Sequence, residues 1–122
     1  MVLALVLAML LATSPTDGQR AYVTANPARS DRLGLATQDG WYSIQPGEGC
    51  AWLGPDDGPT SDPGVVRPGV NVLMHADGDA LVLQVVDPLL GVQDAACPVA
   101  EWVRVSEQPC AKNPAGDCDV AY

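Results

Sequence analysis

The sequence predicts an all-β domain, a small barrel or sandwich stapled by disulfides. Eleven prolines and twelve glycines punctuate the 122 residues, and no stretch repeats apolar residues at helical spacing for more than two turns. Four cysteines follow an apolar N-terminal segment of the kind that directs export, a setting in which cysteines usually pair. Together these observations favour short strands joined by tight turns.

The N-terminal residues have the composition of a signal peptide. Residues 2–12 form an uncharged apolar run, and residues 13–18 are small or polar. The run is too short to span a bilayer, which takes about 20 apolar residues. No Lys or Arg precedes it, which leaves a buried first strand or a misassigned start as alternatives. We expect residues 1–18 to be removed, with cleavage after Ala12 or before Gln19. Residues 19–122 then form one secreted or extracytoplasmic domain.

The charge balance limits the kinds of partner. Fifteen acidic residues against six basic ones give a formal net charge of −9. Such a field repels phosphate backbones and anionic lipid headgroups, so it argues against binding of nucleic acid or of a membrane surface. Cationic partners, divalent ions and neutral polysaccharides remain compatible with this charge. The partners that we expect are a cell-wall polymer or an extracellular protein.

Seven segments have the apolar patterns of strands and are bounded by turn residues. They are residues 20–24, 33–37, 41–44, 51–53, 70–76, 80–87 and 99–105. Asp77-Gly78 lies between two of these runs, and this dipeptide predicts a β-hairpin with a type I′ turn. The segment 80–87 is apolar on both faces apart from Gln84, which predicts a central strand rather than an edge strand.

Residues 54–64 predict an exposed loop. They contain three prolines, three glycines and no large apolar side chain. Asp56, Asp57 and Asp62 make this loop a weak calcium candidate, but their spacing does not match the register of a dedicated calcium loop. Aspartate is also a preferred turn residue. The sequence therefore predicts no metal site.

The four cysteines allow three connectivities, among which sequence alone does not choose. We predict a Cys110–Cys118 bond across a turn-rich segment and a Cys50–Cys97 bond that ties the two halves of the domain together. A zinc site is disfavoured because the chain lacks a Cys-x2-4-Cys pair and has one histidine, His75.

The aromatic residues are the candidate binding residues. They are Trp41, Tyr42, Trp52 and Trp102. Each can fill the core of a domain that has no phenylalanine, or can offer a stacking platform to a sugar or peptide. Trp41 and Tyr42 point to opposite faces of a strand, so one of them is a surface candidate. Core positions are favoured for the tryptophans, and Tyr42 is left open between core and surface.

No catalytic constellation is present in the sequence. His75 lies near Asp77 and Asp79, but a general base also needs a reacting group within about 3 Å. None of the serines lies in a nucleophile motif such as Gly-x-Ser-x-Gly. We therefore expect no enzymatic activity and no cofactor.

Residues 39–53 resemble the closing hairpin of bacterial SH3-like (SH3b) domains. That hairpin often reads Gly-Trp-Tyr-x-Val, a short turn and Gly-Trp-Val; here the segments are Gly-Trp-Tyr-Ser-Ile from residue 40 and Cys-Ala-Trp-Leu from residue 50. Residues 66–73 and 101–105 are similar to the middle strands and the Trp-x-x-Val strand of the family. The resemblance implies a small β-barrel that binds, without catalysis, cell-wall peptide or glycan outside the cell.

These observations predict a noncatalytic secreted or cell-surface binding module. The alternative is a small secreted inhibitor or structural envelope protein that presents the loop 54–64 as its contact surface.

Overall fold

The computed structural model describes residues 17–26, 29 and 31–106. Within these ranges the chain forms seven strands and no helix, which confirms the all-β prediction. The strands are β1 (Arg20–Ala25), β2 (Leu33–Thr37), β3 (Gly40–Pro46), β4 (Asn71–Asp77), β5 (Ala80–Asp87), β6 (Gly91–Val92) and β7 (Cys97–Ser106).

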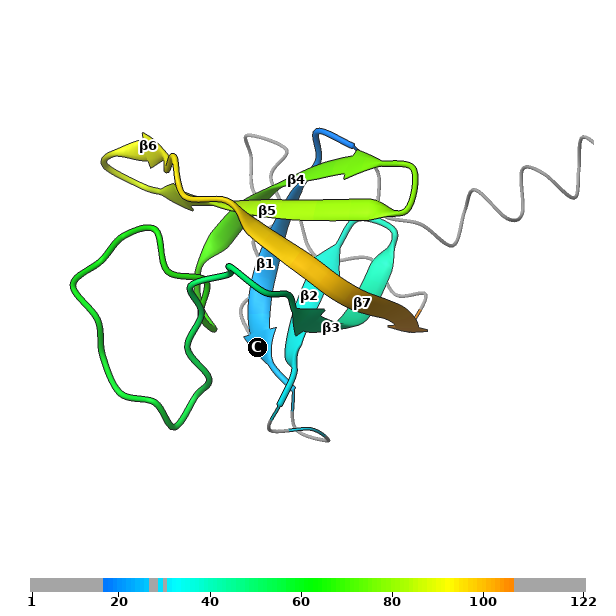
Figure 1. Ribbon diagram of the computed structural model, residues 1–122, viewed down its shortest axis with the longest axis horizontal. Coiled ribbons are helices and arrows are strands. Elements are labelled where there is room, and N and C mark those ends of the chain that lie inside the picture. Colours follow the sequence, from blue (N-terminus) through cyan, green and yellow to red (C-terminus); the bar gives the residue numbers. More distant parts are fainter. Residues whose placement is uncertain (1–16, 27–28, 30, 107–122) are drawn as a thin grey trace, which may run out of the picture.

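Six of the strands close into a barrel. Their order is β4-β1-β2-β3-β7-β5, and β5 pairs back onto β4 to complete the circle (Figure 1). All of these pairings are antiparallel. The short strand β6 is added to β5, beyond the stretch that pairs with β7. The prediction that residues 80–87 form a central strand is confirmed, because β5 has partners on both sides.

The barrel interior is one apolar core built from the alternate residues of the strands. In β3 and β5 buried and half-buried positions follow one another, as expected where one face of a strand is turned inward. The buried members are Ala21, Val23, Leu33, Leu35, Tyr42, Ile44, Val66, Val72, Met74, Leu81, Leu83, Val85, Cys97 and Val99.

The β4–β5 hairpin is present, but its turn differs from the prediction. Asp77 pairs with Ala80, so the two loop residues are Gly78 and Asp79. Gly78 has a φ of +60°, and no non-glycine residue among those described has a positive φ. A positive φ at the first loop position alone is the feature of a type II′ turn, not of type I′. The prediction placed the turn one residue too early.

The predicted strand at residues 51–53 is wrong. Trp52 makes only an isolated parallel bridge to Val66. The amide of Val66 donates to the carbonyl of Ala51 at 3.0 Å, and the amide of Leu53 donates to the carbonyl of Val66 at 2.9 Å. Pro68, which has no N–H to donate, follows soon after Val66, and proline-rich turns follow Leu53, so this ladder does not lengthen.

A disulfide joins this long connection to the barrel. Cys50 is bonded to Cys97, the first residue of β7, with the two Cα atoms 4.1 Å apart. The predicted Cys50–Cys97 pairing is thus confirmed. Cys110 and Cys118 lie outside the described residues.

Most of the predicted signal peptide also lies outside the described residues. Its last two residues bond to the barrel: the Gly18 amide donates to the Met74 carbonyl at 2.8 Å, and Asp17 Oδ1 accepts from the Ala76 amide at 2.9 Å. Of the two predicted cleavage points, the one after Ala12 retains these bonds. No helix in the described part of the chain is long and apolar enough to cross a bilayer.

Loss of the Cys50–Cys97 bond should strongly destabilise the domain. The two cysteines are 47 residues apart, and the chain-entropy model assigns a loop of that size about 4 kcal/mol. The stability of a small domain is commonly about 5–15 kcal/mol. We expect Cys50→Ala/Cys97→Ala to unfold the protein or to lower its urea midpoint greatly. The control, Cys110→Ala/Cys118→Ala, opens a much shorter predicted loop and should lower the midpoint less; equal losses would contradict this ranking.

Candidate functional site

The second half of β7 has an open edge. β5 pairs with β7 only at three positions, from Leu81 opposite Val99 to Leu83 opposite Cys97. β7 then continues to Ser106 with β3 as its single partner among the described strands. In Figure 1, β7 diverges from β5 as it runs toward the lower right. Residues 100–106 therefore present one edge on which no described strand lies.

A surface hollow follows this edge. It has a volume of about 450 Å³ and lies where the β4–β5 turn separates from β7. Its lining residues are Asp79, Ala100, Glu101, Trp102 and Val103. The hollow is thus a direct consequence of β5 ending before β7 does.

The two faces of β7 offer different side chains beside the hollow. Trp102 is half-buried and packs against the core, opposite Ile44 of β3. Val103 and Val105 point the other way and are 57% and 60% exposed. Exposed valines on a strand whose edge is open are an unusual use of apolar surface in a small domain.

The charge at the hollow is negative. Glu101 Oε2 lies 2.9 Å from Arg32 Nη2, and Arg32 Nη2 is also 3.5 Å from Gln45 Oε1. This ion pair partly neutralises Glu101, whose side chain is still 61% exposed. Asp79 is exposed, and no described cation lies within ion-pair distance of it. A ligand with a positive charge near Asp79 is therefore favoured over an anionic one.

The four candidate aromatic residues are in different surroundings. Tyr42 is completely buried and belongs to the core, so it is removed from the candidate binding residues. Trp41 lies on the outer face, where it packs against Ala36, as Tyr22 does, and its Nε1 donates to Thr24 Oγ1 at 3.2 Å.

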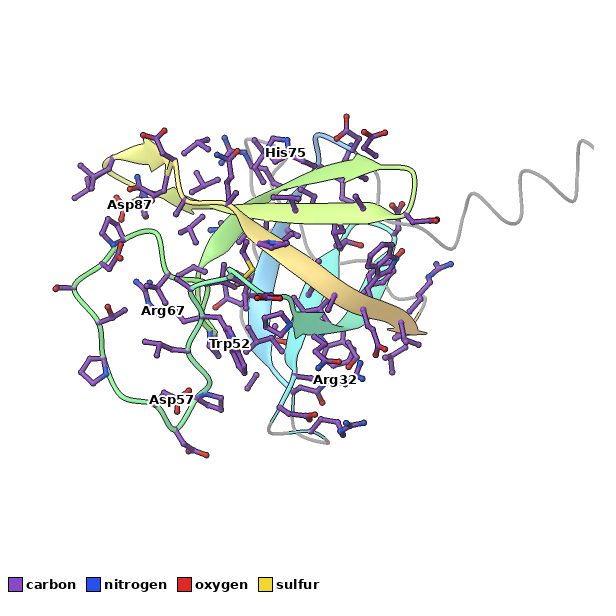
Figure 2. All side chains as sticks on the ribbon, in the orientation of Figure 1. Arg32, Trp52, Asp57, Arg67, His75 and Asp87 are labelled. Atoms are coloured by element: carbon purple, nitrogen blue, oxygen red, sulfur yellow. A yellow bond between two sulfur atoms is a disulfide. The ribbon has the colours of Figure 1, made fainter. Side chains whose placement is uncertain are left out.

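The Trp41 ring covers Gly34 so closely that a Cβ atom there would lie 2.3 Å from its Cζ2 atom. The ring is therefore already packed on the outer face. Trp52, labelled in Figure 2, is half-buried and packs at the margin of the core. Of the four candidates, Trp102 lines a hollow.

Three of the residues with a possible acid–base or metal-binding role, His75, Asp57 and Asp62, make other contacts. The exposed His75 has its Nε2 atom 2.6 Å from Gln84 Oε1, on the neighbouring strand. Asp57 Oδ2 accepts from the Gly54 amide at 2.7 Å, and Asp62 Oδ1 accepts from the Gly64 amide at 2.9 Å. Across the described residues no three His, Cys, Asp or Glu side chains converge as metal ligands. Asp57 and Asp62 thus stabilise turns in the loop 54–64.

The sequence reasoning missed Val103 and Val105 as surface residues. Glu101 lies two and four residues before them, and residues at that spacing share one face of a strand. A charged residue at that position favours the solvent face. The charged Arg104, however, lies on the opposite face with Trp102, so charge alone does not choose between the two faces.

Scans of protein-family models, of curated proteins and of solved structures returned no match for this chain. The SH3-like resemblance accordingly stays a prediction from residues 39–53, 66–73 and 101–105.

The buried hydroxyl of Tyr42 leads to a stability prediction. Its oxygen has no hydrogen-bond partner within the described part of the chain. Burial raises the pKa of this phenol, the positive charge of Arg104 opposes the shift and the negative charge of Asp39 adds to it. We expect Tyr42→Phe to leave the free energy of unfolding unchanged or to raise it by about 1 kcal/mol, because an unsatisfied buried group is removed.

The raised pKa of Tyr42 also gives the sign of a pH effect. Its stabilising contribution is complete below the unfolded-state pKa of about 10 and is lost as the pH rises above that value. Urea unfolding should therefore show that the free energy of unfolding falls between pH 8 and pH 11. This fall should be smaller in Tyr42→Phe and unchanged in the control Tyr22→Phe. A fall of the same size in Tyr42→Phe would contradict the assignment.

Proposed function

We propose that this protein is a noncatalytic binding module that takes an extended peptide along the open edge of β7. The observation that carries the proposal is the β5–β7 pairing, which ends at Val99 while β7 continues for seven more residues. A strand edge has free backbone donors and acceptors, and an added strand satisfies them in the manner of β-augmentation.

The side chains along the edge favour an apolar ligand with a positive charge. A strand laid beside β7 would alternate its side chains between two faces, one near Trp102 and the other near Val103 and Val105. Both faces offer apolar surface. Asp79, at one end of the hollow, and the overall charge of −9 favour a basic residue in the ligand.

A peptide fits this site better than a glycan does. Glycan recognition uses aromatic rings as stacking platforms, and among the described tryptophans only Trp102 lines the hollow, with its ring partly packed on the core. The Trp41 ring is already packed over Gly34. The backbone donors and acceptors along β7 therefore offer a ligand more than the Trp102 ring does.

The proposal places the module outside the cytoplasm. The intramolecular Cys50–Cys97 disulfide is compatible with an extracytoplasmic location. Export by the apolar segment 2–12 and the SH3-like resemblance belong to the same proposal. They make peptides of the cell wall the first natural ligands to test.

Peptides selected from a random display library against the full chain should bind along β7. In NMR titrations they should perturb the amides of residues 100–106, and the selected sequences should be apolar with a basic residue. Val103→Glu should weaken binding by about tenfold or more, because it places a carboxylate at the apolar contact. The matched control is Val92→Glu on β6, an equally simple change at a 43% exposed valine. Equal loss in both variants would contradict the β7 site.

The cell-wall ligand is tested by co-sedimentation of the full chain with two wall preparations. The first is intact wall polymer, and the second is the same polymer after an amidase has removed its stem peptides. We expect retention on the first and loss on the second. Equal retention on the bare glycan strands would instead assign a glycan-binding function.

A second candidate function is a secreted inhibitor that presents residues 54–64. The specific observation in its favour is that the loop projects from the barrel while its first end is held in place (Figure 1). The Cys50 disulfide and the two hydrogen bonds to Val66 hold that end, and Pro55, Asp56 and Pro59 are exposed. Inhibition of a secreted protease by the folded chain, lost on cutting within residues 54–64, would favour this function over peptide binding.

A further inference from the structure

A second cavity lies at the other end of the barrel, independent of the proposed peptide site. It has a volume of about 170 Å³ and lies between the end of the loop 54–64 and the ends of β4 and β5 that carry Asn71 and Asp87. Figure 2 shows Arg67 and Asp87 on the same side of the molecule, near the long loop and the β5–β6 hairpin. Its walls combine apolar residues with three polar ones: Pro63, Arg67, Gly69, Val70, Asn71, Val85, Val86, Asp87 and Pro88.

Opposite charges line this cavity without pairing with one another. Arg67 is anchored by a 3.0 Å bond from its Nη1 to the Val65 carbonyl, and no described carboxylate lies within ion-pair distance of it. Asp87 Oδ1 accepts from the amides of Leu89 and Leu90 at 2.8 and 2.9 Å. These two bonds fix the carboxylate at the cavity, and they leave its second oxygen without a hydrogen bond among the described residues.

Asn71, which lines the same cavity, adds an acceptor. Its Oδ1 atom is buried and has no hydrogen-bond partner among the described residues, although buried polar atoms in folded proteins are nearly always satisfied. Leaving such an acceptor unpaired is unfavourable, so a bound donor at this place is stabilising. The site therefore offers a cation at Arg67, an anion at Asp87 and an open acceptor at Asn71.

We propose that this cavity binds a small zwitterion, a free α-amino acid, with its carboxylate at Arg67 and its ammonium group between Asp87 and Asn71 Oδ1. A ligand with only one charge would leave one of the two facing charges unpaired. The volume and the apolar walls formed by Val70, Val86 and Pro88 suit a small aliphatic side chain.

The test is an NMR titration of the full chain with glycine and with valine. Both should give saturable shifts at the amides of Asn71, Val86 and Asp87 and at the Asn71 side-chain amide. Arg67→Gln and Asp87→Asn should each weaken binding by about tenfold or more, since each removes a charge-assisted contact. Asparagine at position 87 still accepts the Leu89 and Leu90 amides, so the turn is preserved. Acetate and methylammonium, which each carry half of the ligand's charge pattern, should bind about tenfold more weakly than glycine or not at all.

The matched control is Arg29→Gln. It removes the same charge from an exposed arginine that pairs with Asp31 at 3.1 Å and does not line the cavity, so it should bind glycine as the unaltered chain does. Three results would overturn the proposal: no saturable shift with either amino acid, unchanged affinity in Arg67→Gln, or acetate binding as tightly as glycine. None of these results bears on the β7 site, whose ligand and variants are different.

Discussion

The short pairing between β5 and β7, the seam at which the barrel closes, is the constraint on which the rest of the structure depends. Three residue pairs, from Leu81–Val99 to Leu83–Cys97, close the circle of six strands. Cys97 lies within this seam and is covalently bonded to Cys50, so the disulfide fixes the place at which the barrel closes. The same bond holds the long connection through Trp52 and Val66 against the barrel, where Val66 joins the core.

The length of the seam also determines which surfaces are available for binding. Because β5 begins only at Ala80, next to the last residue that pairs with β7, β7 continues beyond it with one edge open, beside a hollow lined by Trp102 and Val103. At the opposite end β5 extends past its pairing with β7 to pair with β6, and its last residue, Asp87, lines a small cavity together with Arg67. The two proposed sites thus arise from the two ends of one strand.

Local patterns predicted the strands well, whereas non-local pairing lay beyond them. The segments 33–37 and 80–87 have the same bounds in the structure, because alternation and turn residues act within a few positions. The prediction of a strand at residues 51–53 failed because a strand also needs a partner. The partner here is Val66, and Pro68 follows it too soon for the pairing to lengthen. Alternation predicted that Trp41 and Tyr42 lie on opposite faces of the strand, but not which of the two faces the core. The polar residues Ser43 and Gln45 lie on the same face as Trp41, and they could have identified that face as the outer one. The β5–β7 pairing joins residues that are far apart in the sequence, and no local pattern predicts such a contact. Both proposed sites depend on contacts of this kind.

Amide hydrogen exchange along β7 of the full chain tests the open edge most directly. A strand with one partner has alternate amides bonded to that partner and the others directed away from it. We predict that the amides of Cys97 and Val99 are protected, since both residues pair with β5, and that residues 100–106 alternate between slow exchange toward β3 and fast exchange at the open edge. Addition of a selected peptide should slow the fast set. Uniformly slow exchange over residues 100–106 in the free protein would show that the edge is already covered and would contradict the account.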